Sequence, residues 1–128
     1  MAAARPFLRQ VLLLQRDVPR AAAFYGDGLG LDVIAVTRKY AELDAGGGAR
    51  IALKHVDSEA QCTVGYSPFL NFAVPDVTAA VARLVSMGAV MDGAIKYQAS
   101  GKLAALRGPD GHMIALFEPN GPLPGEDG

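Results

Sequence analysis

The sequence predicts an α+β fold built from two tandem βαβββ modules, and three observations lead to this prediction. A strand-like apolar run, an aspartate and an alanine-rich segment occur in that order at residues 10–25 and again at residues 69–84. The triplet Ile-Ala-Leu recurs at residues 51–53 and 114–116, near the end of each half. Strand-like segments separated by glycine turns follow each alanine-rich segment. Because such a repeat indicates a duplicated structural unit, we expect paired sheets that curve around a shared cavity.

Module 1 is predicted to span about residues 6–57. After its first strand, Asp17 has the position of a helix N-cap, because its carboxylate can accept amide bonds of the first turn. The helix then covers roughly residues 18–27, with Phe24 and Tyr25 as core anchors. Three strand-like segments follow, at residues 32–40, 40–46 and 50–56.

Module 2 is predicted to span about residues 68–119. Asp76 caps a helix over roughly residues 77–87, which ends at Gly88. Three strand-like segments follow this helix as well, at residues 94–98, 102–108 and 112–118. The polar segment at about residues 58–67 is predicted to be a linker between the modules, and residues 120–128 are predicted to be a flexible tail.

Length and composition exclude several classes of function. A chain of 128 residues with half of its residues apolar is expected to form one globular domain. A net charge of −1 gives no basic surface for nucleic acid, and no apolar run approaches a membrane span of about 20 residues. Cys62 is the single cysteine, which excludes an internal disulfide. The segment before the first apolar run is too short for a secretion signal, so we expect a cytoplasmic protein.

Three segments, at residues 16–31, 74–89 and 108–119, together resemble the vicinal oxygen chelate superfamily in order and spacing. That superfamily includes glyoxalase I, bleomycin-resistance proteins and extradiol dioxygenases. The resemblance implies a single domain of paired βαβββ modules, each curling into a half-barrel, and a homodimer. It implies less about activity, because the fold serves isomerases, oxygenases, transferases and binding proteins.

The enzymes of this superfamily hold a divalent cation with four inward side chains, one from the first and one from the last strand of each module. The resemblance places these ligand positions at Gln10, Ala52, Phe69 and Ala115. Three of the four side chains have no lone pair for a metal ion, and one amide oxygen does not hold a cation alone. We therefore predict no metal, no cofactor and no catalytic residue.

Neighbouring side chains are not expected to replace the missing ligands. Successive strand residues face opposite sides of a sheet, and His55, His112 and Glu118 each lie three positions from a ligand position. His112, in the turn before the last strand, is predicted to be a surface residue. A register slip of one residue would reverse these faces, although the agreement between the two halves argues against it.

The inward positions instead predict an apolar cavity with a few polar groups. We predict that its ligand-binding residues are Gln10, Ala52, Lys54, Phe69, Asn71, Ala115 and Phe117. Phenyl rings offer faces for a planar ligand, and the two alanines leave room for it. The alternative is that the rings are core residues, that the Gln10 amide bonds to the backbone, and that Lys54 is solvated. Tyr66 and Tyr97 lie in or near loops that could border the mouth.

Three hypotheses about function remain open. The first is a metal-free protein that sequesters or senses a small apolar or aromatic molecule, as bleomycin-resistance proteins do. The second is a glyoxalase-like lyase or isomerase with atypical ligands. The third is an interaction protein whose cavity has collapsed around Phe69. Other catalytic motifs are absent from the sequence, since it contains no Gly-x-Ser-x-Gly elbow and no phosphate-binding loop. Cys62, in the linker, is predicted to be an incidental thiol.

Overall fold

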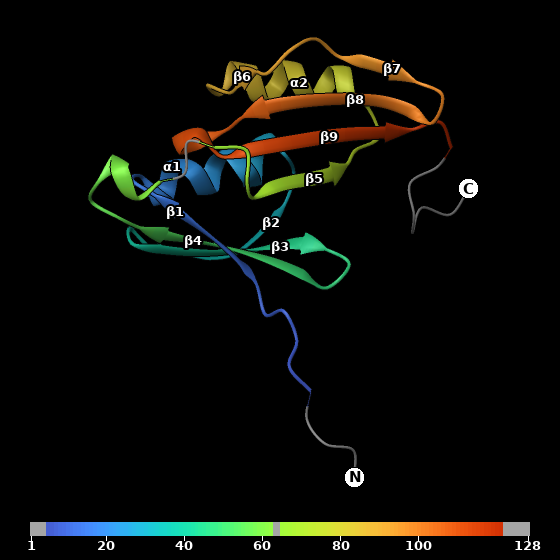
Figure 1. Cartoon of the computed structure of the whole chain (residues 1–128). Helices are drawn as coiled ribbons and strands as arrows, with labels where there is room; N and C mark the ends of the chain where they lie inside the picture. The colour runs from blue at the N-terminus through green and yellow to red at the C-terminus, as the bar shows by residue number, and fades with distance from the viewer. Residues whose placement is uncertain (1–4, 63–64, 122–128) are drawn as a thin grey trace.

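Each half of the chain forms one mixed sheet, as Figure 1 shows for the computed structural model, which describes residues 5–62 and 65–121. The strands are β1 (Val11–Gln15), β2 (Asp32–Val36), β3 (Tyr40–Gly46), β4 (Ala49–His55), β5 (Phe69–Ala73), β6 (Val90–Met91), β7 (Lys96–Gln98), β8 (Gly101–Arg107) and β9 (Met113–Pro119). The first sheet has the order β1-β4-β3-β2, and the second has the order β5-β9-β8-β6 with β7 also paired to β8. In each sheet the first and last strands of the module are parallel neighbours. Both sheets are open and curved, and the α+β prediction is confirmed.

The two predicted helix caps are confirmed. Helix α1 (Val18–Ala23) begins after Asp17, whose Oδ1 accepts a bond of 3.1 Å from the Arg20 amide. Helix α2 (Val77–Ser86) begins after Asp76, whose Oδ1 accepts a bond of 3.0 Å from the Ala79 amide. Such a side-chain acceptor satisfies one of the amides that have no partner in the first turn.

The end of the first helix differs from the prediction. Instead of continuing as an α-helix to residue 27, the chain widens at Phe24–Gly28 into a π-helical turn, η1, in which the Leu29 amide bonds to the Phe24 carbonyl at 3.1 Å. A Cβ at Gly28 would lie only 2.8 Å from the Met87 sulfur and 2.9 Å from Leu84 Cδ2. The turn therefore brings bare backbone against α2, a contact that helical periodicity does not encode.

Two predicted strand segments are shorter in the structure. The segment 32–40 is interrupted by a turn, in which the Thr37 amide bonds to the Tyr40 carbonyl at 2.7 Å. The segment 94–98 is reduced to β7, and β6 precedes it. Two further short helical turns, η2 (Glu59–Gln61) and η3 (Pro109–Gly111), lie in connections. Residues 63 and 64 of the predicted linker, and residues 122–128 of the predicted tail, lie outside the described residues.

One apolar core lies between the helices and the helix-facing sides of both sheets. Alternate residues of the strands supply its buried side chains, which include Leu13, Ala41, Leu43, Ile51, Leu53, Ala104, Leu106, Ile114 and Leu116. Phe24 and Tyr25 are 2% and 0% exposed, which confirms them as core anchors. Burial of each large apolar side chain contributes about 1.5–3 kcal/mol, so this shared core is the main force that joins the modules.

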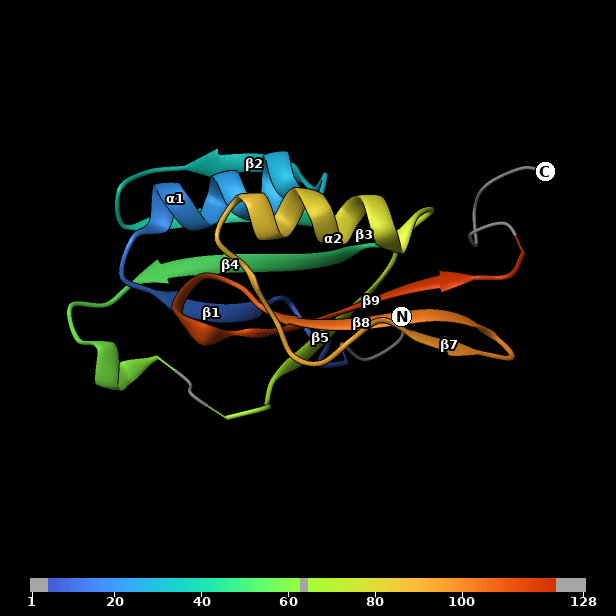
Figure 2. The same cartoon turned by 90° about the horizontal axis from the view of Figure 1, so that it is seen from above.

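The helices lie side by side (Figure 2), and polar contacts join the modules near them. Asp110 of η3 accepts two bonds from Arg16, from the amide at 2.8 Å and from Nε at 2.9 Å. The Arg83 Nε of α2 donates to the Gly28 carbonyl at 2.6 Å. No helix among the described residues is long and apolar enough to cross a membrane.

His112 is buried at this junction, so the prediction that it is a surface residue is wrong. Its ring is 4% exposed, and its Nε2 lies 2.9 Å from the Leu14 carbonyl oxygen of module 1. The turn before β9 is covered because it docks on the end of β1. Cys62 is also buried here, with its Sγ 3.5 Å from the same carbonyl oxygen. Burial, and next the negative charge of Asp110, raise the pKa of the Cys62 thiol.

Substitution of Gly101 by alanine is expected to destabilise the fold strongly. A Cβ at this buried position, which has φ +153°, would overlap the Glu118 carbonyl oxygen in the neighbouring strand β9. The strands would have to separate, and we expect Gly101→Ala to lower the free energy of unfolding by about 3 kcal/mol or more in urea denaturation. Gly93→Ala is the matched control, because its φ is +90° but a Cβ there has open space. Equal losses in the two variants would contradict the assigned contact.

The thiol of Cys62 is expected to react slowly in the folded protein. Only the thiolate is nucleophilic, and a raised pKa lowers the thiolate fraction near neutral pH. We therefore expect alkylation by iodoacetamide near pH 8 to be at least about tenfold slower in the native protein than in urea, measured by intact-protein mass spectrometry. The raised pKa of the Cys62 thiol also makes the free energy of unfolding depend on pH. The unfolded chain loses this proton at lower pH, so stability should fall as the pH rises above the ordinary thiol pKa. Equal alkylation rates in the native and the urea-unfolded protein would contradict the burial of Cys62.

Candidate functional site

Ala52 and Ala115 occupy matching positions on the sheet faces that point away from the helices. In the first sheet Ala52 lies between Leu12 of β1 and Glu42 of β3. Residues directly opposite each other in neighbouring strands share a face, so these side chains surround the alanine methyl group. Ala52 is fully buried, whereas Leu12 is 45% exposed. The alanine therefore forms the floor of an open surface.

We call the surface around Ala52 the polar face. It comprises Gln10, Leu12, Leu14, Tyr40, Glu42, Asp44, Arg50, Ala52 and Lys54. The Tyr40 hydroxyl donates to Gln10 Oε1 at 3.4 Å, and Glu42 Oε2 lies 3.7 Å from the Arg50 guanidinium. Lys54 is exposed and is aligned with Leu14 and Tyr40.

The surface around Ala115 is the apolar face. It comprises Phe69, Asn71, Ala73, Leu103, Ala105, Met113, Ala115 and Phe117, with Arg107 at one end beside Met113. Ala115 is 7% exposed and lies between Asn71 of β5 and Ala105 of β8. Phe69 is 44% exposed at the start of β5, and Phe117 is partly buried between Ala73 and Leu103.

The structure thus collects the predicted ligand residues in two groups. Gln10, Ala52 and Lys54 share the polar face, and Phe69, Asn71, Ala115 and Phe117 share the apolar face. Asn71 also lines a cavity of about 340 Å³ between β5 and the chain that follows η1, together with Leu29, Leu31 and Phe72. That cavity contains no residue of the polar face, so it does not join the two groups.

Sequence reasoning missed Tyr40 and Glu42 on the polar face. The hairpin turn at residues 46–48 pairs β3 with β4, and the register of that pair places Glu42 opposite Ala52 and Tyr40 opposite Lys54. A bulge between Asp44 and Gly46 shifts that register, so simple counting across the turn gives the wrong face.

The side chains at the four positions where the resemblance places metal ligands do not fit a divalent cation. The Gln10 oxygen already accepts the Tyr40 hydroxyl, and Ala52, Phe69 and Ala115 have no donor atom. Glu118 faces the helices, where its Oε1 accepts the Val77 amide at 2.9 Å, as the strand alternation predicts. Within residues 5–62 and 65–121, no group of three or more His, Cys, Asp or Glu side chains is placed to hold a metal ion.

The two tyrosines proposed to border a cavity mouth lie in different places. Tyr66 precedes β5 and is 59% exposed, and the Arg107 guanidinium lies 5.0 Å from its ring centroid. Tyr97 is on β7, 73% exposed, with the Lys102 ammonium 5.8 Å from its ring centroid. Lys102 pairs with Glu118 and shares its helix-facing side, so Tyr97 lies away from the apolar face.

Several solved structures have the same fold as this chain although their sequences are only distantly similar to it. A glyoxalase/bleomycin resistance protein/dioxygenase family enzyme from Burkholderia phytofirmans PsJN is 21% identical with a TM-score of 0.71, covering 86% of this chain and 96% of that one. The hypothetical protein SA1046 from S. aureus is 16% identical with a TM-score of 0.73, covering 90% and 95%. The bleomycin-binding protein of Streptomyces verticillus, solved with copper(II)-bleomycin, is 21% identical with a TM-score of 0.60, covering 88% and 97%. At these identities the likeness shows the fold.

The family itself is shown by a match along most of the sequence. No curated protein matches the chain. The family model described as Glyoxalase/Bleomycin resistance protein/Dioxygenase superfamily matches residues 8–116, a range that contains both alanine floors and both helix caps. This chain therefore belongs to the Glyoxalase/Bleomycin resistance protein/Dioxygenase superfamily.

Proposed function

We propose that this protein is a metal-free member of its superfamily that binds a small molecule, for sequestration or for sensing. The observation that carries the proposal is the pair of alanine floors. Ala52 and Ala115 stand where the resemblance places metal ligands, and the surrounding side chains are mostly apolar or already paired. A surface of this kind supplies contact area and a few directed polar groups, which are the elements of a binding site.

The two faces together favour an amphipathic aromatic ligand. Phe69 and Phe117 offer rings on which a planar group can stack. Lys54 and the Gln10 amide can bind an anionic or polar group at the other end of the ligand. The bleomycin-binding protein of Streptomyces verticillus has the same fold and was solved with copper(II)-bleomycin. This likeness supports bleomycin as the first ligand to test.

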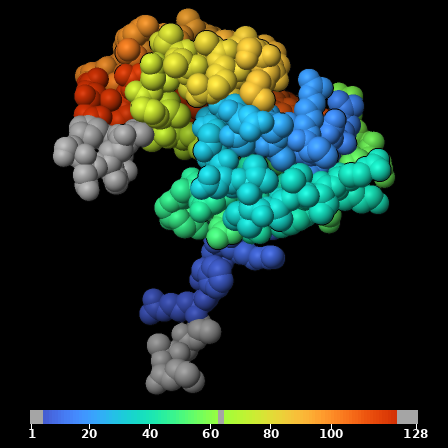
Figure 3. Space-filling view, turned by 180° about the vertical axis from the view of Figure 1, so that it is seen from behind, coloured from blue at the N-terminus to red at the C-terminus, as the bar shows by residue number. Residues whose placement is uncertain are grey.

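We further propose that the protein is a homodimer in which a second copy covers the open faces. Leu12 and Phe69 are 45% and 44% exposed, and Phe7 and Leu8, before β1, are 83% exposed. Figure 3 shows the dark blue N-terminal segment projecting away from the body of the molecule. Apolar area left in water at these places would be buried by a partner chain.

The ligand proposal predicts a loss of affinity on removal of one ring. We expect Phe69→Ala to weaken the binding of bleomycin and of 1-anilinonaphthalene-8-sulfonate by about tenfold, because an exposed ring that stacks on a ligand contributes about 1–1.5 kcal/mol. Calorimetry measures the first and fluorescence the second. Tyr97→Ala removes an exposed ring on the other side of the second sheet and should leave both affinities unchanged.

Two results would contradict this ligand proposal. Equal affinities of Phe69→Ala and the unsubstituted protein for both probes would remove the apolar face from the site. Stoichiometric metal in native mass spectrometry of protein purified without chelator, or turnover that depends on added Ni²⁺, Zn²⁺, Mn²⁺ or Fe²⁺, would favour the glyoxalase-like alternative.

The dimer proposal predicts a species of twice the 13.3 kDa chain mass in native mass spectrometry and light scattering. Phe7→Ser combined with Leu8→Ser should raise the dimer dissociation constant by at least about tenfold, because both side chains lose apolar contact area. Val85→Ser combined with Tyr97→Ser is the control, since these side chains are 43% and 73% exposed on the helix side of module 2. A monomeric unsubstituted protein at micromolar concentration would contradict the dimer.

A further inference from the structure

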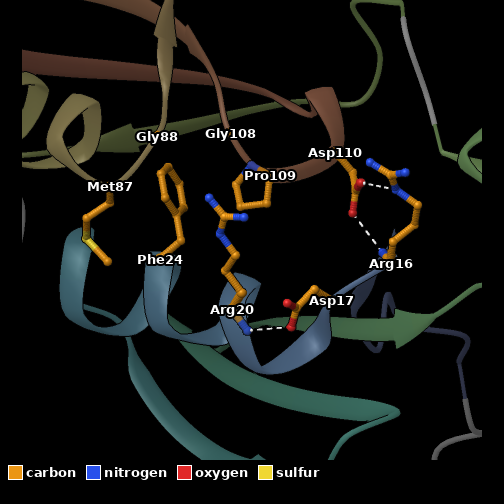
Figure 4. A pocket seen from close by; sticks show the side chains of 9 residues that line it. All are labelled: Arg16, Asp17, Arg20, Phe24, Met87, Gly88, Gly108, Pro109 and Asp110. Carbon is orange, nitrogen blue, oxygen red and sulfur yellow. Dashed lines mark hydrogen bonds and ion pairs between the residues drawn. The ribbon is translucent and has the colours of Figure 1, made fainter.

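A cavity of about 380 Å³ lies at the module junction, on the helix side of the sheets (Figure 4). Module 1 contributes Arg20 and Phe24, and module 2 contributes Met87 and Gly88 at the end of α2 and Pro109 and Asp110 of η3. None of the residues of the polar face or the apolar face lines it. The junction cavity is therefore distinct from the site proposed above, and a ligand could occupy it whether or not that site binds one.

The charged side chains of this cavity differ in whether they have partners. Both carboxylate oxygens of Asp110 accept bonds from Arg16, at 2.8 and 2.9 Å. Asp17 Oδ1 accepts the Arg20 amide at 3.1 Å, which leaves that oxygen engaged in the helix cap. Within the described residues, the Arg20 guanidinium has neither an ion pair nor a hydrogen bond. Of the two arginines that line the cavity, Arg20 is thus the one whose guanidinium is unpaired in the described part of the chain, since Arg16 is paired with Asp110.

The Arg20 side chain points into the cavity. Figure 4 shows its guanidinium between the Phe24 ring and Pro109, directed toward module 2. Its Nη2 lies 3.7 Å from the place that a Cβ of Gly88 would occupy, so the group reaches across the junction. A guanidinium presents parallel N–H donors that match the two oxygens of a carboxylate.

The wall beside Arg20 is apolar. The Phe24 ring, the Met87 thioether and Pro109 all line the cavity. Aromatic rings pack favourably on phenyl edges and on methionine sulfur. A volume of about 380 Å³ lies in the range of small-molecule sites, so a single ring with an acidic substituent fits it.

Contacts that the fold already needs keep these walls in place. Arg16 and Asp110 tie η3 to the end of β1. The Phe24 ring is anchored because Cε1 lies 3.1 Å from the Cβ position of Gly108, on the strand side of the cavity. A site whose walls are fixed before binding costs little ordering entropy when a ligand enters.

We propose that the junction cavity binds a small aromatic carboxylate, with the carboxylate on the Arg20 guanidinium and the ring against Met87 and Pro109. The carboxylates of Asp17 and Asp110 also line the cavity and repel an anionic ligand, and the ligand forms only one ion pair. The expected dissociation constant for a single-ring acid is therefore on the order of a millimolar.

The test is a titration of the full chain with sodium benzoate, followed by ¹H–¹⁵N correlation spectra at constant ionic strength. We expect saturable shifts of the Gly88 and Gly108 amides, which lie on the cavity wall. Benzamide has the same ring without the charge and should bind at least about tenfold more weakly, because a charge-assisted bond is lost.

Arg20→Gln should weaken benzoate binding at least about tenfold without unfolding, because the Arg20 guanidinium has no partner to lose in the part of the chain that the structure describes. Arg38→Gln removes an exposed arginine from the turn between β2 and β3 and should bind benzoate as the unsubstituted protein does. Three results would overturn the proposal: no saturable shift at Gly88 and Gly108, equal affinity of Arg20→Gln, or equal binding of inorganic phosphate and benzoate. Saturable shifts confined to the apolar face would also overturn it, while supporting the site proposed there.

Discussion

The close approach of the two modules at two glycines is the constraint on which the rest of the structure depends. Gly28 lies against Met87 and Leu84 of α2, with only 2.8 and 2.9 Å available to a Cβ. Gly108 lies against Phe24 and Ile114, at 3.1 and 2.9 Å. Because neither position has a side chain, backbone from each module enters the core of the other. One shared core results, in place of two cores that would each be too small to stabilise a module.

Because the shared core lies on the helix side of the sheets, a binding surface made of strand side chains can form only on the opposite sides or at the edges. A strand presents alternate residues to its two faces, so the residues that do not reach the core must face outward. Most of those residues are less buried than Leu13, Leu53 or Leu116, although Ala52 and Met113 are buried as well. The outward faces are thus the places where site residues can differ between proteins of one architecture.

The repeat in the sequence predicts the fold and the face of most site residues, because caps and strand alternation are local properties. Asp17 and Asp76 begin their helices as predicted, and Ala52 and Ala115 match across the sheets. The burial of His112 could not be predicted, because it depends on a carbonyl group 98 residues away in the sequence. The cavity around Arg20 was missed for the same reason, since its walls come from segments that no local pattern connects.

The two outward faces share a buried alanine at their centre but differ in the side chains around it. Around Ala52 the side chains include an amide, a phenol and an ion pair, whereas around Ala115 they include two phenyl rings, aliphatic groups and the Asn71 amide. A polar face alone holds no apolar ligand, and an apolar face alone gives a ligand no fixed orientation. A twofold dimer places identical faces in symmetric surroundings, and each polar face can then lie opposite the partner's apolar face. Such an arrangement would give two equal cavities, each with one wall that stacks and one that orients. The proposed ligand class and the proposed dimer are therefore compatible, because both use the same outward residues.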